Sequence, residues 1–530
     1  PCTYIALAAI SLGNGPYKEW NAMELELERT PLDGFTAVLG TAVAQEETME
    51  SIVPDACPDL LGICDTEGVV CLHRKEAVEG RVELSGTIHA LLLCQPDGEV
   101  GLRRLEVDLP FTCTADSADI SPNCRIVAEP RLRGADARLV NPRKVLVRAD
   151  LVVDIQVFAP ETDWACAAVL EPEQAGIEQL NESCETCVTV CVQEKPFTFS
   201  DELTLAGSRP EAEALLKWRV SLECGEAKVI GSKLIFKGNA KLQVLYRCTD
   251  GGLSTGEFDL PISQLIEVIG AGEESMCQVH LILTDLECAL DDDDGRTISL
   301  TMGLLAQAVV REERNLVLLT DLYSTVYDLD TQVKSLTLSR IADRGEREIA
   351  VRELLETGIL PQDVLDAYVT FADITQSRED TRVSLTASVN VNLLCRTDSG
   401  EITAVTRNIP VTCPVELPEG AHCTCRCYCT APVYAAPASS GVEVRFPVRF
   451  GWLALTNSKS AAVSAVTFDE NAPKDHTGQP SIVLRMVSGG ERLWDIAKSY
   501  GTTAQDVMQA NALDDEELPE GQLLLIPRKR

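Results

Sequence analysis

The chain has 530 residues, of which 45% are hydrophobic, and its 82 acidic and 46 basic residues give a net charge of −36. A length of this order predicts about three to four domains with cores of their own. The acidic balance excludes a protein that binds nucleic acid or anionic lipid through a basic surface.

The N-terminal segment contains one apolar stretch, at residues 4–12. It is shorter than the roughly 20 apolar residues of a spanning helix, and no other run approaches that length. It also lacks the basic leader of a signal peptide. The sequence therefore predicts neither a transmembrane segment nor a signal peptide, and leaves this stretch as a candidate extra strand for self-assembly.

The body of the chain repeats itself at an interval of about 150 residues, the size of a whole domain. In each copy a strand of alternating polar and apolar residues enters a turn that contains Gly and Asp, as β-hairpins do. These strands are residues 79–94, 233–248 and 382–395. They end at Cys94, Cys248 and Cys395, which we place at one repeat position.

Two further blocks recur in the same order in each copy. The return strands contain Leu-Pro or Ile-Pro, at residues 109–110, 260–261 and 409–410. After a turn, a closing strand follows at residues 141–149, 295–302 and 441–446. These recurring strands and turns predict a mainly β protein with three β-sandwich-like repeats.

One motif in the first copy points to a family. It consists of Val53-Pro54-Asp55, Pro58-Asp59 and, downstream, Asn141-Pro142-Arg143-Lys144-Val145. With these residues the chain resembles the SPOCS repeat family, found in spore-envelope proteins of endospore-forming Firmicutes. The resemblance covers about residues 20–460, and the second and third copies lack the Val-Pro-Asp block.

Two segments separate the predicted domains. Residues 161–195 are rich in Glu and Cys, and residues 470–482 contain loop-forming residues without an apolar period. We interpret both as linkers, the second of them flexible. The predicted β domains are therefore residues 1–160, 196–330 and 331–469, followed by a small domain at residues 483–530.

The 21 cysteines are numerous for a cytosolic protein, and their odd number prevents complete pairing within one chain. Cys423, Cys425, Cys427 and Cys429 alternate, so on a strand they lie on one face with about 7 Å between neighbours. That spacing is too long for adjacent thiols to pair with each other. They remain buried residues, thiols paired with neighbouring strands, candidates for intermolecular disulfides, or metal ligands.

A second cysteine group contains Cys184, Cys187 and Cys191, with Cys166 upstream. It resembles part of a zinc site but has a single Cys-x-x-Cys pair. We treat Cys184, Cys187 and Cys191 as further cross-linking candidates and predict no metal and no cofactor.

Two hairpins are flanked by cysteines that are candidates for pairing. They are Cys94 with Cys113 and Cys395 with Cys413, whereas the second copy has Ser263. A disulfide at this place is therefore not a requirement of the repeat.

The sequence contains no recognisable catalytic motif. Its five histidines form no zinc-protease helix, and neither a serine nucleophile elbow nor a phosphate-binding loop occurs. We therefore predict a protein that is not an enzyme.

The last fifty residues predict a small domain with the order strand, helix, helix, strand. One face of the first helix is formed by Leu493, Ile496, Ala497 and Tyr500. A capping-box pattern that starts at Thr502 opens the second helix, and Pro527 ends the closing strand. Residues 483–528 resemble a LysM domain, which binds N-acetylglucosamine polymers or, in some proteins, another protein.

The LysM resemblance implies a ligand groove between two loops. The predicted groove residues are Ser488, Gly489, Gly490, Glu491, Arg492, Leu493, Asn511, Ala512, Leu513 and Pro519. Glu491 and Arg492 replace the usual Asp-Thr, which removes a helix-capping hydroxyl and puts charges where a neutral sugar lies. We interpret them either as solvated surface residues or as part of a groove for a protein, with Trp494 as a partly exposed anchor.

Several SPOCS repeats followed by one LysM domain is an arrangement found in proteins required for spore coat assembly. The LysM end of those proteins is thought to join a coat morphogenetic protein at the forespore surface. The resemblance therefore implies a non-enzymatic spore-envelope protein, made in the mother-cell cytoplasm, whose repeats mediate protein–protein assembly and whose LysM domain docks to a coat protein or the cortex. One alternative is a cell-wall protein that binds peptidoglycan, and another is a self-assembling, disulfide-linked shell or fibre subunit.

Overall fold

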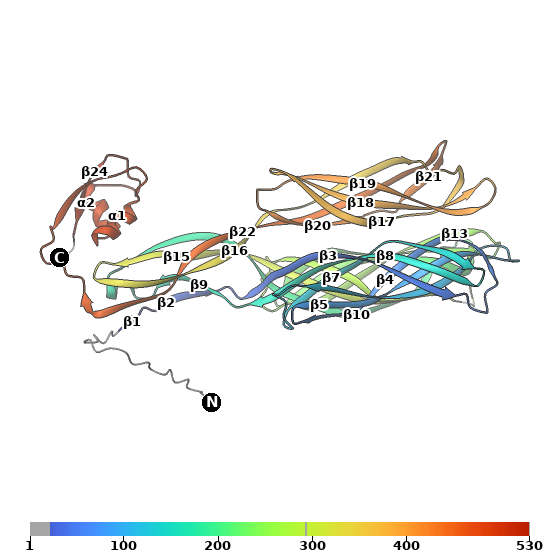
Figure 1. Cartoon of the computed structure of the whole chain (residues 1–530), viewed down its shortest axis with the longest axis horizontal. Helices are drawn as coiled ribbons and strands as arrows, with labels where there is room; N and C mark the ends of the chain where they lie inside the picture. Colours follow the sequence, from blue (N-terminus) through green and yellow to red (C-terminus); the bar gives the residue numbers. More distant parts are fainter. Residues whose placement is uncertain (1–21, 292–293, 529–530) are drawn as a thin grey trace, which may run out of the picture.

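The structure, a computed structural model, describes residues 22–528 apart from residues 292 and 293 (Figure 1). The apolar stretch at residues 4–12 lies outside the described residues. Strands make up most of the described chain, and its two α-helices lie near the C-terminal end. The prediction of a mainly β protein is confirmed.

The first copy is a sandwich of a three-stranded antiparallel sheet and three strands of a six-stranded sheet that continues into the second copy. One sheet is the meander β4 (Leu60–Val78), β5 (Arg81–Pro96) and β6 (Arg103–Asp116). In the other sheet β8 (Lys144–Glu161) lies between β3 (Gly34–Ile52) and β7 (Arg125–Asn141). The first strand of the copy therefore pairs with its last strand, which closes the unit.

The second copy repeats this plan. Its meander is β11 (Ala212–Ile230), β12 (Lys233–Cys248) and β13 (Leu253–Glu267). In the other sheet β15 (Thr297–Ser324) lies between β10 (Ile177–Thr204) and β14 (Met276–Leu290).

The third copy has the same two sheets with a divided edge strand. Its meander is β17 (Pro361–Glu379), β18 (Arg382–Thr397) and β19 (Ile402–Glu416). In the other sheet β22 (Gly441–Pro473) lies between β16 (Tyr327–Leu355) and the pair β20 (His422–Cys429) and β21 (Tyr434–Ala438). The prediction of three β-sandwich-like repeats is confirmed.

The recurring residues explain why each copy folds in this way. In β5, the alternate side chains of Val82, Leu84 and Ile88 are buried, because successive residues of a strand point to opposite faces. The Leu-Pro and Ile-Pro pairs lie in β6, β13 and β19, each at an edge of its sheet. At an edge, the N–H that proline lacks is not needed for the ladder.

The two halves of the SPOCS-like motif meet in space. Val53 and Cys57 lie in the loop after β3, and Arg143 lies in the turn between β7 and β8. The Arg143 guanidinium donates to the backbone oxygens of Val53 at 3.0 Å and Cys57 at 2.6 Å. The arginine therefore ties this loop to the closing hairpin of the first copy.

The three sandwiches lie side by side in one body, which we call the head (Figure 1). At its centre an apolar cluster brings together residues from all three copies. The cluster contains Leu93, Leu245 and Leu394, then Cys64, Leu216 and Leu365, then Leu102, Leu253 and Ile402. Each of these three sets occupies one position of the repeat, so the copies are related by an approximate threefold axis.

The outer ends of several strands continue beyond the head and form a second body, which we call the stalk (Figure 1). It consists of β1 (Ala22–Glu24), the ladder of β2 (Leu27–Pro31) with β9 (Trp164–Val169), and two longer ladders. These are residues 177–189 of β10 with 311–324 of β15, and residues 327–341 of β16 with 455–473 of β22. Leu319 and Val463 lie in its core.

The stalk corrects the predicted linker at residues 161–195. Most of these residues are strand, because β9 covers 164–169 and β10 begins at Ile177. In β10 the charged side chains of Glu182 and Glu185 are exposed, while Cys187 and Cys191 are buried. The Glu- and Cys-rich composition therefore belongs to a half-buried strand, and the second copy begins at Ile177 instead of residue 196.

The C-terminal domain has the predicted order of β23 (Ile482–Met486), α1 (Leu493–Tyr500), α2 (Ala504–Asn511) and β24 (Leu523–Pro527). Leu493, Ile496 and Val507 form its core. The cap of α2 is Thr503, whose hydroxyl accepts the N–H of Asp506 at 3.0 Å, one residue after the predicted position.

Candidate functional site

The predicted LysM groove residues fall into three classes of exposure. Leu493 is buried, with 1% of its surface accessible, because it is the first core position of α1. The exposed residues are Ser488, Gly489, Gly490, Arg492, Ala512 and Pro519, and the partly exposed ones are Glu491, Asn511 and Leu513. Leu493 is therefore a core residue and does not contribute to the surface of the predicted groove.

The two charges that replace the usual loop residues have partners within the domain. Glu491 accepts the backbone N–H of Ser488 at 2.9 Å and pairs with Arg485. Arg492 makes no side-chain cap for α1 and instead binds the Asp495 carboxylate through bonds of 2.9 and 3.0 Å. These bonds hold the pKa of Asp495 below its ordinary value. The charges of this loop are therefore held by ion pairs within the domain.

Asn511, at the end of α2, is bound to the backbone of its own domain. Its amide nitrogen donates to the backbone oxygens of Val507 at 2.8 Å and Leu525 at 2.7 Å, and its oxygen accepts the N–H of Leu525. The two loops approach each other at Gly489, where a Cβ would lie 3.2 Å from the Glu520 carboxylate. A side chain at Gly489 would therefore displace the Glu520 carboxylate by a few tenths of an ångström.

Four side chains fix the LysM domain to the stalk. We expected one of them, Trp494, beside the groove, and the sequence did not indicate the other three. The indole N–H of Trp494 donates to Asp321 of β15 at 2.8 Å, and the Lys498 ammonium pairs with the same carboxylate at 2.6 Å. The ring of Tyr323 lies 4.9 Å from that of Trp494, and its hydroxyl donates to the backbone oxygen of Thr502 at 2.7 Å. Trp494 is 7% exposed, so the prediction of a partly exposed anchor beside the groove is wrong.

This contact also changes the interpretation of residues 470–482. Strand β22 continues to Pro473, and the Lys474 ammonium donates to the backbone oxygen of Ser324 at 2.8 Å. The connection is therefore shorter than predicted, and it joins two bodies that already touch. We now expect the contact at Asp321 to restrain the movement of the LysM domain relative to the body.

The four alternating thiols of β20 all pack against the core of the third copy, as predicted for one face of a strand. They are partly buried, which does not favour cross-links to another chain. The described cysteines are all free, and no group of three or more His, Cys, Asp or Glu side chains in this part of the chain could hold a metal. The structure therefore does not assemble a zinc site from Cys166, Cys184, Cys187 and Cys191.

The hairpin cysteines do not face each other. Cys113 lies opposite Leu84, which is ten residues before Cys94 in β5. At about 3.3 Å per residue the two cysteines are roughly 33 Å apart along the strand, so they cannot pair. Cys413 is placed in the same way relative to Cys395, because it lies opposite Leu385.

The strand register also corrects the cysteine equivalence between copies. Cys94, Tyr246 and Cys395 are the residues that follow Leu93, Leu245 and Leu394, which share one repeat position. Cys248 lies two residues further along, so the sequence alignment of Cys248 with Cys94 and Cys395 is wrong.

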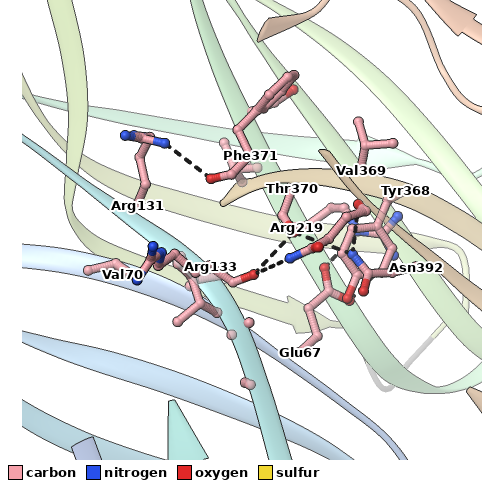
Figure 2. Close-up of a pocket in the computed structure, with 18 of the residues that line it drawn as sticks. Glu67, Val70, Arg131, Arg133, Arg219, Tyr368, Val369, Thr370, Phe371 and Asn392 are labelled. Atoms are coloured by element: carbon pink, nitrogen blue, oxygen red, sulfur yellow. Dashed lines mark hydrogen bonds and ion pairs between the residues drawn. The ribbon is translucent and has the colours of Figure 1, made fainter. Parts of the chain in front are cut away.

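A cavity of about 770 Å³ lies between the three sandwiches (Figure 2). Strands from all three copies line it, and polar groups cross between the copies at its wall. Arg131 of the first copy donates to the backbone oxygen of Phe371 at 3.1 Å, and Asn390 of the third copy donates to that of Arg133 at 2.9 Å. Arg131 also pairs with Asp154 at 2.7 Å.

Lys217 of β11 is the centre of a charged cluster beside this cavity. It is 1% exposed and contacts carboxylates of the other two copies. It pairs with Asp65 and with Glu67 at 2.9 Å in β4, and it lies 3.6 Å from Asp366 in β17. Asp65, Lys217 and Asp366 each follow the second β-bulge of their strands and so occupy one repeat position.

Arg219 lies two residues after Lys217 in β11 and belongs to the same cluster. It pairs with Glu67 at 2.7 Å and with Asp366, and its guanidinium lies 4.0 Å from the ring centroid of Tyr368 (Figure 2). Burial raises the pKa of Glu67 and Asp366, but Arg219 and Lys217 outweigh that effect and hold both pKa values below the ordinary range. The cluster is therefore ionised and joins all three copies.

A second cluster lies on the other sheets of the head. Glu129 in β7, His280 in β14 and Arg426 in β20 also occupy one repeat position, opposite Asp154, Gln307 and Gly451. The Arg426 guanidinium contacts the Glu129 carboxylate and Nδ1 of His280. Burial and the nearby Arg426 lower the pKa of His280 well below its ordinary value, so the imidazole is neutral.

Sequence analysis did not find these two clusters. The sequence signal for the first cluster is the recurrence of charged residues at one position of β4, β11 and β17. It is hard to recognise because these strands share no residue motif. Their bulges also interrupt the alternation by which strands are recognised. The charged side chains of the two clusters are paired and the neutral His280 is in contact with Arg426, so their chemistry is that of an interface.

Comparisons with known protein families agree with this architecture. Residues 211–291 match the family model described as SipL, SPOCS domain, and residues 486–527 match that of the LysM domain. These are non-catalytic binding domains. The chain thus has a SPOCS domain, formed by β11 to β14 of its second copy, and a C-terminal LysM domain, whereas the sequence resemblance relied on the first copy.

No curated protein and no solved structure matches the chain. Within the described residues, no helix is long and apolar enough to cross a bilayer.

Proposed function

We propose that this protein is a non-enzymatic structural protein of the spore envelope, with the head and stalk as an assembly scaffold and the LysM domain as the docking end. The SPOCS match supports a role in sporulation, and the LysM match supports binding at the cell wall or cortex. We further propose synthesis in the mother-cell cytoplasm and a final place at the forespore surface.

The contact between α1 and the stalk carries this proposal. Trp494 and Lys498 are engaged with Asp321, while the loops at Ser488 and Pro519 remain exposed. The LysM domain therefore sits at the end of a long body with its loops accessible (Figure 1). This attachment to the stalk suits a scaffold that holds its binding domain at a fixed distance from the head.

A protein is our first choice as the ligand of these loops, specifically a coat morphogenetic protein or another spore-envelope protein. Arg492 and Asp495 form an exposed ion pair at the rim, and the second loop carries Asp514, Asp515, Glu516 and Glu517, all exposed. Charged rims give specificity in protein–protein contacts. Peptidoglycan is the second choice, because the LysM match supports glycan binding.

A charge reversal in the full chain distinguishes these ligands. Arg492→Glu alters the rim, and Lys459→Glu makes the same change at an exposed residue of the stalk. Capture of spore coat proteins on immobilised protein and pelleting with purified peptidoglycan are measured for both variants. We expect Arg492→Glu to weaken coat-protein capture about tenfold, which corresponds to about 1.4 kcal/mol, and Lys459→Glu to leave it unchanged.

Two outcomes would count against protein docking. One is equal capture of coat proteins by the wild type, Arg492→Glu and Lys459→Glu. The other is binding to peptidoglycan, measured by pelleting, that is as strong as binding to coat proteins. A fluorescent fusion in sporulating cells tests the location, and we expect removal of residues 483–530 to disperse the signal from the forespore surface.

A further inference from the structure

Two thiols of the third copy lie close to each other on the edge strand β20. The sulfurs of Cys425 and Cys427 are 4.0 Å apart. The next thiol of the strand is engaged differently, because Cys429 donates to the backbone oxygen of Ala431 at 3.0 Å. Cys425 and Cys427 are thus a pair within the row of four.

We propose that Cys425 and Cys427 form a site of reversible oxidation, at which a peroxide converts the two thiols into an intramolecular disulfide. The Cys425 thiolate attacks one oxygen of hydrogen peroxide, the O–O bond breaks, hydroxide leaves and a sulfenic acid forms. The Cys427 thiol then attacks this sulfur, the S–S bond forms and water leaves. In sum, two thiols lose two electrons and two protons, and one peroxide becomes two waters.

The roles of the two thiols follow from the hydrogen bond between them. The contact between the two sulfurs, in which either thiol can donate, lowers the pKa of Cys425 and raises that of Cys427. By contrast, burial raises the pKa of Cys71 and Cys94 to about 12. Because the thiolate is the reactive form, Cys425 is the attacking group and the buried thiols elsewhere stay protonated.

The bond requires strand β20 to shorten locally. Residues i and i+2 of an extended strand have Cα atoms about 6.6 Å apart, at the upper limit of about 6.8 Å for a disulfide, which is why strand spacing alone argues against pairing of adjacent thiols. Strand β20 pairs with β22 alone among the described strands, so one of its edges is free to bend. Cys427 lines the central cavity and Cys425 is partly exposed, which gives a small oxidant a way in.

Arg426 lies between the two thiols and couples their oxidation to the packing of the three copies in the head. Arg426 points to the opposite face of β20 and contacts Glu129 of the first copy and His280 of the second. Drawing Cys425 and Cys427 together bends the strand at Arg426 and displaces its guanidinium from both partners. Oxidation therefore loosens the third copy from the other two.

The chemistry is tested on the full chain, which is reduced, freed of reductant, incubated with EDTA and treated with one equivalent of hydrogen peroxide. The remaining thiols are alkylated and the protein is digested with trypsin, which cuts after Arg426. A bond between Cys425 and Cys427 then appears by mass spectrometry as two peptides that dithiothreitol separates. We expect this species to form before any other disulfide, to persist in Cys429→Ser, and to be lost in Cys425→Ser.

The proposal is overturned if the wild-type chain gives no such linked peptides, or if Cys425 is joined to a second chain. The wild-type result stands even where a serine variant fails to fold, which thermal unfolding reveals. The link to Arg426 is tested by small-angle scattering, and we expect oxidation to increase the radius of gyration and dithiothreitol to reverse it. An unchanged radius in the oxidised, disulfide-containing protein rules that coupling out.

Discussion

Lys217 is surrounded by carboxylates from two other copies of the repeat and has almost no contact with solvent. Burial by itself lowers the pKa of this lysine, but Glu67 and Asp65 raise it well above its ordinary value. The ammonium is therefore charged and compensates the negative charges of the cluster. Removing it leaves Asp65 without this ion-pair partner and leaves Arg219 alone to compensate Glu67 and Asp366.

We predict that Lys217→Met destabilises the head by about 3–5 kcal/mol, the usual result of breaking a buried ion pair from one side. The measurement is urea-induced unfolding followed by circular dichroism. Lys459→Met, at an exposed stalk position, is the matched control and should change stability by less than about 0.5 kcal/mol. A Lys217→Met protein with the midpoint of the wild type would show that the cluster contributes little.

The same cluster predicts a dependence of stability on acid. Glu67 and Asp366 have pKa values lowered by Arg219 and Lys217 after the opposing effect of burial. Their contribution is therefore complete above the pKa of an unfolded carboxyl group, about 4, and is lost as the pH falls through the lower folded values. Thermal unfolding between pH 7 and pH 2 should show this loss, and Asp366→Asn should flatten the profile. The exposed Asp330→Asn is the control, and a profile equally steep in Asp366→Asn would contradict the assignment.

Among the elements, the contact between α1 and β15 decides how the LysM domain is held. Asp321 accepts hydrogen bonds from both Trp494 and Lys498, and it lies on the stalk side of the contact. Changing Asp321 therefore tests the contact without touching the core of the LysM domain.

We predict that Asp321→Ala releases the LysM domain from the stalk, because two charge-assisted hydrogen bonds are lost. Limited trypsin cleavage after Lys474 should become about tenfold faster, as expected for a loss of about 1.4 kcal/mol. Asp330→Ala, an exposed acidic residue on β16, serves as the control. Equal cleavage rates in both variants would mean that the contact does not restrain the connection.

At the scale of the whole molecule, the first two copies share their hydrophobic cores. Val69 and Leu91 of the first copy pack in the core of the second, and Ile282 of the second packs in that of the first. The third copy joins them through the apolar cluster at Leu394 and the two charged clusters. Therefore none of the three sandwiches is a separate domain joined to the others only by a linker.

We predict that the head unfolds in a single cooperative transition, because separating one copy exposes core residues and unpaired charges of the others. Differential scanning calorimetry of the full chain measures this directly. Three resolved transitions, one for each sandwich, would be the contrary result.

The sequence predicted the strands and helices of this protein better than it predicted how they pack together. The alternation in β5 and its equivalents, the edge prolines and the turns predict the sandwiches, because these signals are local. The helical faces of the LysM domain are equally local. The predicted linker at residues 161–195 was wrong because composition does not show that Cys184 packs against the stalk core and Cys191 lies in the core of the second copy.

Local sequence patterns were enough to predict the mainly β class, the three repeats and the LysM order, since strand and helix periods are properties of neighbouring residues. Which side chains meet across copies depends on the packing of the three sandwiches. Asp65, Lys217 and Asp366 are about 150 residues apart in the chain, yet they converge because equivalent strands face one approximate threefold axis. Likewise, the place of Trp494 depends on Asp321 and Tyr323, which no local pattern of the LysM segment contains.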